Sequence, residues 1–118
     1  MFRVTGTKIT LHKGDTGAMV VNLTGHTFTS SDRAVFTIAN RNGTTILMSE
    51  EYEISNGSFT VQFTNEVTDK WPAGSYKWEV RVFINPTRTD GEITGGDEVI
   101  TPFDEPQDIV VSPVLYDA

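Results

Sequence analysis

The stretch that decides the fold is Tyr76–Ile84, which reads YKWEVRVFI. Apolar side chains occupy every second position, and charged side chains fill most of the positions between them. This alternation predicts a strand with one face in the core and the other in water. We expect Trp78 to lie at the centre of that core. The strand should end at Asn85-Pro86, because proline cannot donate a hydrogen bond to a sheet.

Further alternating segments lie on both sides of this strand. They are centred near Leu11, Val21 and Phe36, and turn residues separate them. Asn42-Gly43 and Asn56-Gly57 each stand between two apolar runs. Asn-Gly readily adopts the two positive φ values of a type I′ turn, so both predict β-hairpins. A short helix within residues 64–71 and two closing strands, 98–103 and 107–112, complete the expected elements.

The composition favours strands over helices. The chain of 118 residues contains 17 Thr, 12 Val and 8 Ile, but only 4 Leu and 5 Ala. Branched side chains pack well on pleated surfaces and lose rotamer freedom in helices. We therefore predict an all-β fold, an immunoglobulin-like β-sandwich of seven to eight antiparallel strands. An open barrel is the main alternative. The length predicts a single domain over 1–118, with a core at about 5–112 and a short tail at 113–118.

The charge is concentrated in the last quarter of the sequence. Residues 1–88 carry nine bases and eight acids, whereas residues 89–118 carry eight acids and no base, which gives the net charge of −7. Nucleic acids and anionic membranes need clustered positive charge, so we expect neither as a partner. The acidic part is interpreted as a solvated surface, with a contact face for a basic partner as the alternative. There are no cysteines, which excludes disulfides and thiolate chemistry.

Catalytic and metal-binding patterns are weak. His12 stands near Asp15, and His26 precedes Ser30-Ser31-Asp32, but such coincidences arise in any chain with two histidines. We therefore expect no enzymatic activity and no cofactor. Calcium needs several converging oxygen atoms, and solvated turn acids are the default interpretation of the available carboxylates. The weak calcium candidates are Asp90, Glu92, Asp97 and Asp108.

Aromatic residues beside loops offer two different roles. Tyr76 follows Pro72-Ala73-Gly74-Ser75 at the start of the main strand, the place of a tyrosine corner, in which the hydroxyl bonds to the preceding backbone. Trp71 and Tyr52 also stand beside loops. Packing beneath a loop is the favoured interpretation for both, and exposure as a binding platform is the alternative. The residues proposed for an interaction surface are Trp71, Tyr52, Asp90 and Glu92.

Two motifs carry a resemblance to a known family. Gly14-Asp15-Thr16 follows the first predicted strand, and PAGSYKWEV, residues 72–80, leads the main one. Together they resemble the immunoglobulin-like N-terminal domain of upper baseplate proteins from tailed phages of Gram-positive bacteria, over residues 5–112. That family usually has arginine before Gly-Asp-Thr, where this chain has Lys13. The residues that the resemblance implies as fold-determining are Gly14, Asp15, Thr16, Gly74 and Tyr76.

The resemblance implies a small structural protein of a virion or prophage. Its function would be non-catalytic assembly of a phage tail or baseplate by protein–protein docking, with assembly in the bacterial cytoplasm and localisation in the virion. The expected partners are other tail or baseplate proteins, with a homo-oligomer also possible. The alternative function is a cell-surface adhesion or carbohydrate-binding module that uses Trp71, Tyr52 or Phe28 as a platform, with or without calcium.

Overall fold

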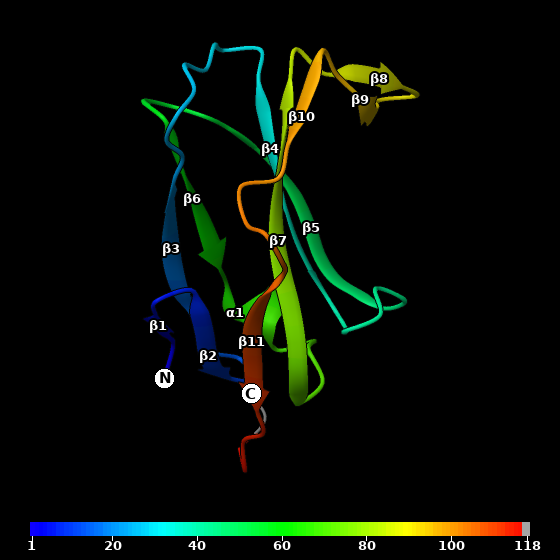
Figure 1. The fold of residues 1–118 in the computed structure, drawn as a ribbon. Helices are drawn as coiled ribbons and strands as arrows, with labels where there is room; N and C mark the ends of the chain where they lie inside the picture. The colour runs from blue at the N-terminus through cyan, green and yellow to red at the C-terminus, as the bar shows by residue number, and fades with distance from the viewer. Residues whose placement is uncertain (117–118) are drawn as a thin grey trace.

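The computed structural model describes residues 1–116, and the predicted tail residues 117–118 lie outside this part of the chain. The described chain is almost entirely β-structure, with one helical turn (Figure 1). The elements are β1 (Arg3–Thr5), β2 (Lys8–His12), β3 (Gly17–Asn22), β4 (Arg33–Ala39), β5 (Ile46–Glu53), β6 (Ser58–Phe63), α1 (Asn65–Thr68), β7 (Gly74–Ile84), β8 (Thr87–Thr89), β9 (Glu92–Gly95), β10 (Glu98–Ile100) and β11 (Gln107–Ser112).

The strands form a β-sandwich. The large sheet has the order β1-β2-β11-β7-β4-β5, with β10 also paired to β7. Among residues 1–116, the opposing layer contains only β3 and β6, and β8 and β9 form a separate hairpin at one end of the molecule (Figure 1). Alternate residues of both layers meet in one core, where the ring of Phe36 on β4 lies edge-on to that of Phe63 on β6, 6.1 Å between centroids. The all-β sandwich prediction is confirmed.

The strand count and direction differ from the prediction. Residues 1–116 contain eleven strands rather than seven or eight, because several are short. One pairing is parallel: β11 lies alongside β2, with Ile109 opposite Ile9. The remaining pairings are antiparallel. β1 was not predicted, and the strand structure therefore begins at Arg3, before the predicted core boundary.

The two Asn-Gly turns also differ from the prediction. Asn56 and Gly57 both have positive φ, 52° and 75°, as predicted for a type I′ turn. However, this turn joins β5 to β6, which belong to different sheets, and the hairpin contracts to one bridge between Ser55 and Ser58. At Asn42-Gly43 only Gly43 has a positive φ, so β4 and β5 form a hairpin through a longer loop.

The main strand behaves as its alternation predicts. Trp78 is 2% exposed, and its ring lies 5.4 Å from that of Phe36 and 5.2 Å from that of Phe103. Its indole Nε1 donates to the carbonyl of Thr7 at 2.9 Å. The strand therefore anchors both the loop that carries Phe103 and the turn between β1 and β2.

The turn between β2 and β3 contains the first family motif. Gly14 has a φ of 87°, and Asp15 accepts a hydrogen bond from the backbone of His12 at 2.8 Å. From α1, Asn65 Nδ2 donates to the Gly14 carbonyl and Thr68 Oγ1 donates to the Asp15 carbonyl, at 2.8 and 2.7 Å. These bonds attach the turn to α1, which ends before Pro72, as expected.

Tyr76 forms the predicted tyrosine corner, since its hydroxyl donates to the carbonyl of Pro72 at 2.7 Å. We predict that Tyr76→Phe lowers the free energy of unfolding by about 1 kcal/mol, because it removes one hydrogen bond and keeps the ring. Urea denaturation of the two proteins measures this difference. Equal stability of Tyr76→Phe and the parent would contradict a structural role for the hydroxyl.

Candidate functional site

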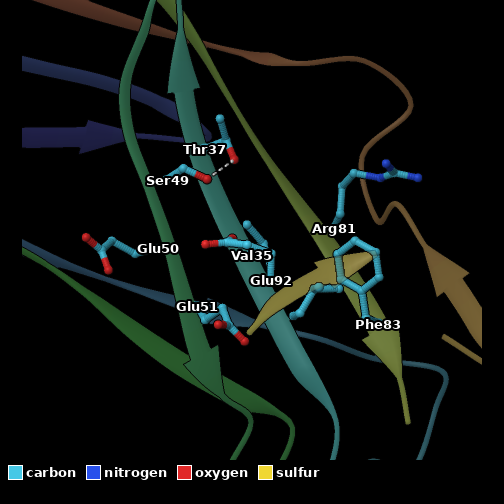
Figure 2. A pocket seen from close by; sticks show the side chains of 9 residues that line it. Val35, Thr37, Ser49, Glu50, Glu51, Arg81, Phe83 and Glu92 are labelled. Atoms are coloured by element: carbon cyan, nitrogen blue, oxygen red, sulfur yellow. Dashed lines mark hydrogen bonds between the residues drawn. The ribbon is translucent and has the colours of Figure 1, made fainter. Parts of the chain in front are cut away.

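The outer face of the large sheet carries a groove of about 450 Å³. Its floor is formed by solvent-facing side chains of three neighbouring strands, and the β8–β9 hairpin forms one wall (Figure 2). Val35 and Phe83 supply apolar surface, while Thr37 and Ser49 form a hydroxyl pair at 3.2 Å. The lining residues are Val35, Thr37, Ser49, Glu50, Glu51, Arg81, Phe83, Glu92 and Ile93.

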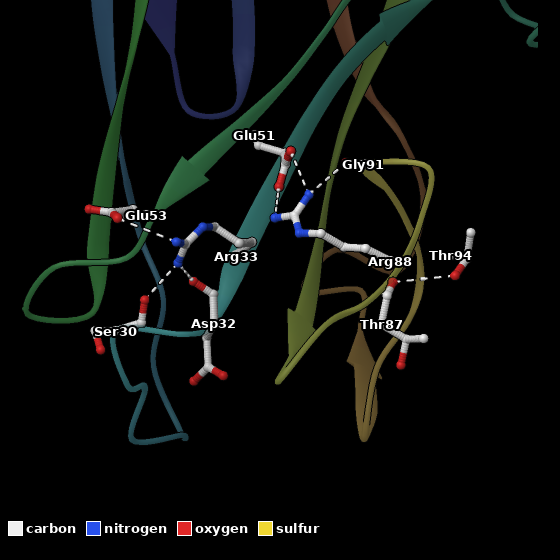
Figure 3. A network of polar contacts seen from close by, with 9 residues as sticks. All are labelled: Ser30, Asp32, Arg33, Glu51, Glu53, Thr87, Arg88, Gly91 and Thr94. Atoms are coloured by element: carbon white, nitrogen blue, oxygen red, sulfur yellow. Dashed lines mark hydrogen bonds and ion pairs between the residues drawn. The ribbon is translucent and has the colours of Figure 1, made fainter.

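The groove exists because the hairpin is attached to the sheet. Both terminal nitrogens of the Arg88 guanidinium group donate to the carboxylate of Glu51, at 2.6 and 3.1 Å, and one of them also donates to the carbonyl of Gly91 (Figure 3). The planar guanidinium matches the two carboxylate oxygens, which makes this geometry more specific than a single contact. The hydrogen bonds from Arg88 lower the pKa of Glu51, against a smaller opposing effect of burial. Glu51 therefore stays charged as the acceptor at neutral pH.

A buried carboxylate fixes the base of the hairpin. Asp32, 2% exposed, accepts hydrogen bonds from the backbone amides of Thr29 and Asn85, at 2.8 and 2.9 Å. Asn85 in turn bonds Asp97 through its side-chain amide, at 3.0 Å. Burial acts to raise the pKa of Asp32, but the bonds from Thr29 and Asn85 outweigh it and lower this pKa. Asp32 thus joins the loop before β4 to the end of β7.

The predicted interaction residues separate into two groups. Asp90 and Glu92 lie on the β8–β9 hairpin, which the Arg88–Glu51 contact holds over the outer face of the sheet. Tyr52 lies on β5 opposite buried Ala34 in the register, so it faces the core instead. Tyr52 is half-buried and stacks on Phe59, with 5.3 Å between ring centroids. The prediction that Trp71 belongs to an interaction surface is wrong, because Trp71 is 2% exposed and packs edge-on against Phe63. The interpretation that it packs beneath a loop is confirmed.

The weak calcium candidates do not converge. Asp108 pairs with Lys77 at 2.5 Å on the sheet, and Asp97 bonds Asn85 at the base of the β8–β9 hairpin. Residues 1–116 contain no group of three or more His, Asp or Glu side chains arranged to hold a metal ion. The Nδ1 atom of His12 lies 3.8 Å from Asp15 Oδ2.

Arg88, Glu51 and Asp32 are the organising residues that sequence reasoning missed. One signal was available for Arg88, which is the single basic residue in the acidic segment 85–97. Its partner lies 37 positions away in the sequence, which no local pattern indicates.

No helix within the described chain is both long and apolar enough to cross a membrane.

Comparison with known proteins assigns this chain to no family. No family model matches the sequence, and no curated protein matches it significantly.

We expect the Arg88–Glu51 ion pair to restrict local opening of the β8–β9 hairpin. Arg88→Ala should leave the urea midpoint nearly unchanged, because exposed ion pairs contribute little to global stability. Backbone amides of residues 87–95 should, however, exchange with deuterium at least about tenfold faster, since the hairpin loses its attachment to the sheet. Arg88→Lys, which keeps the charge but not the paired geometry, should give an intermediate rate. Unchanged amide exchange at residues 87–95 in Arg88→Ala would show that Arg88 does not hold the hairpin on the sheet.

Proposed function

We propose that this chain is a non-catalytic docking module of a phage tail or baseplate, which binds neighbouring subunits through the groove on its outer sheet face. The observation that carries the proposal is the hairpin held over that face by Arg88 and Glu51. A groove shaped by fixed secondary structure is suited to receive a partner segment without prior reorganisation. The phage assignment rests on the resemblance of residues 5–112 to upper baseplate domains.

The sheet edge beside the groove supports docking. β5 is eight residues long and ends the large sheet, so its outer edge has no strand partner among residues 1–116. Unpaired edges accept extended segments of other chains through backbone hydrogen bonds. The groove therefore combines a backbone template on one side with side-chain contacts on its floor.

The charge of the groove favours a partner with basic side chains. Three glutamates and one arginine line it, and Glu51 is already engaged by Arg88. Figure 2 shows Glu50 on the side of β5 away from the other lining side chains, which leaves Glu92 on the hairpin as the carboxylate beside the open groove. Complementary charge accelerates and orients association, so assembly should weaken as salt rises.

The first test is the presence of the protein in particles. Mass spectrometry of purified particles from a lysogen that encodes the chain should detect it together with other tail proteins. Detection of the other tail proteins without this chain would contradict the assignment to the virion.

The second test concerns the groove itself. Glu92→Arg should reduce incorporation into particles, because it reverses the charge beside the groove. Glu105→Arg is the matched control, since Glu105 is exposed and lies outside the groove lining. Equal incorporation of both variants and the parent would show that docking uses another surface.

A further inference from the structure

The edge of β3 lacks the features that normally keep an exposed strand from pairing. β3 pairs with β6 and with no other strand of the described chain. Its sequence, GAMVVN, contains no charged residue and no proline. Val20 at its centre is 58% exposed. Natural proteins protect such edges with charges, prolines, bulges or covering segments, so an unprotected edge indicates a pairing surface.

The opposing sheet extends beyond this edge. Val4 on β1 lies opposite Ile9 on β2 in the pairing register, and cross-strand partners share a face of the sheet. Ile9 is fully buried in the core, so Val4 also faces the inside of the sandwich. Val4 is nevertheless 37% exposed, because the small sheet ends at β3 and offers no strand to cover it. A strand added to β3 would cover this side chain.

Two adjoining cavities line the open side of the sandwich. One of about 230 Å³ lies between Val4 and the residues of β3, with Trp78 and Phe103 at its base. The other, of about 400 Å³, continues past Asn22 toward Phe28 and Ile100. Among the described residues that line either cavity, Glu98 is the one acidic or basic side chain besides His26. In a chain with 21% charged residues, this depletion is typical of the buried part of a protein interface.

The opposite side of the sandwich disfavours pairing between two copies of this chain. Glu50 on β5 lies opposite buried Phe36 in the register, so it occupies the inward face at the edge of the large sheet. An inward-pointing charge at an edge disfavours pairing with another copy. The β3 side carries no such charge.

From these observations we infer that β3 pairs with β3 of a second copy, in an antiparallel dimer with a two-fold axis near Val20. The two small sheets then become one four-stranded sheet, β6-β3 of one protomer continued by β3-β6 of its partner. A two-fold interface brings the same surface to itself, so only an edge without net charge pairs favourably in this way. The partner's strand also covers Val4. This surface is distinct from the proposed docking groove, so the dimer leaves that groove accessible.

The dimer is tested by a single introduced cysteine, because the chain has none of its own. Directly opposed residues of antiparallel strands have Cα atoms about 4.5–5.5 Å apart, within the range that a disulfide spans. Val20→Cys should therefore form a disulfide-linked dimer under mild oxidation. Thr60→Cys is the matched control, since Thr60 is exposed and is the register partner of Val20 on β6. It should remain monomeric on a denaturing gel.

Sedimentation measures the unmodified association. The parent protein should show a concentration-dependent dimer, and Val20→Lys should raise the dimer dissociation constant at least about tenfold, because two ammonium groups then face each other. Thr60→Lys should leave the constant unchanged. A parent that stays monomeric up to its solubility limit overturns the inference, as does equal crosslinking of Val20→Cys and Thr60→Cys. If the parent protein dimerises but is absent from purified virions, that result contradicts the proposed function and leaves the dimer inference standing.

Discussion

Replacing Trp78 with alanine is expected to lower the free energy of unfolding by about 3–5 kcal/mol. The side chain is 2% exposed and packs between the rings of Phe36 and Phe103, so its removal leaves a cavity at the centre of the sandwich. The carbonyl of Thr7 also loses the indole donor at 2.9 Å. Small domains are stable by only about 5–15 kcal/mol, so this change removes a large share of the total.

Urea denaturation followed by far-ultraviolet circular dichroism measures the effect. Trp78→Phe keeps an aromatic ring but removes the indole N–H, and its loss should be smaller than that of alanine. Ile46→Ala is the surface control, because Ile46 is 60% exposed and its truncation should change stability by less than about 0.5 kcal/mol. A Trp78→Ala protein as stable as the Ile46→Ala protein would contradict the assignment of Trp78 to the core.

Replacing Asp32 with alanine is expected to cost about 2–4 kcal/mol at neutral pH. The substitution removes the carboxylate that accepts from the backbone amides of both Thr29 and Asn85, in two part-buried hydrogen bonds. Because Asn85 begins the segment that carries the hairpin, deuterium exchange should rise at residues 85–97 as well as in the loop before β4. A stability equal to the parent would contradict the bridging role.

Asp32 should also make the free energy of unfolding depend on pH. The pKa of Asp32 in the folded state is lowered from its ordinary value of 3.8 by the two amide bonds, despite its burial. As pH falls below about 3.8, the unfolded chain binds this proton first, so the stability contributed by Asp32 is full above that pH and is lost as pH falls through the folded pKa. Asp32→Asn removes the titration. The stability difference between the parent and Asp32→Asn, measured in urea, should therefore shrink between pH 7 and pH 3.

Some residues of the candidate site could be predicted from the sequence, whereas the contact that shapes the site could not. From the sequence alone, Tyr52, Asp90 and Glu92 were proposed for an interaction surface, together with Trp71. The sequence did not indicate the ion pair between Arg88 and Glu51, which holds the β8–β9 hairpin over the sheet. It also allowed Trp71 as an exposed platform, although this residue lies in the core. A sugar-binding platform would have to use Tyr52 or Phe28, and both are half-buried.

What the sequence determined by itself is local. Alternation set which face of each strand is apolar, as at Tyr76–Ile84, and the residues around Pro72 specified the tyrosine corner. Asn56-Gly57 specified a turn with two positive φ values. These features depend on backbone preferences and on side chains a few positions apart.

The tertiary structure alone decided which elements meet. The turn at Asn56-Gly57 leads β6 into the other sheet because Phe59, Val61 and Phe63 are buried there, in the core that both layers share. β11 runs parallel to β2, and Arg88 reaches Glu51 across the sheet. Such pairings follow from the packing of the whole core, since the same alternating pattern is compatible with many strand orders.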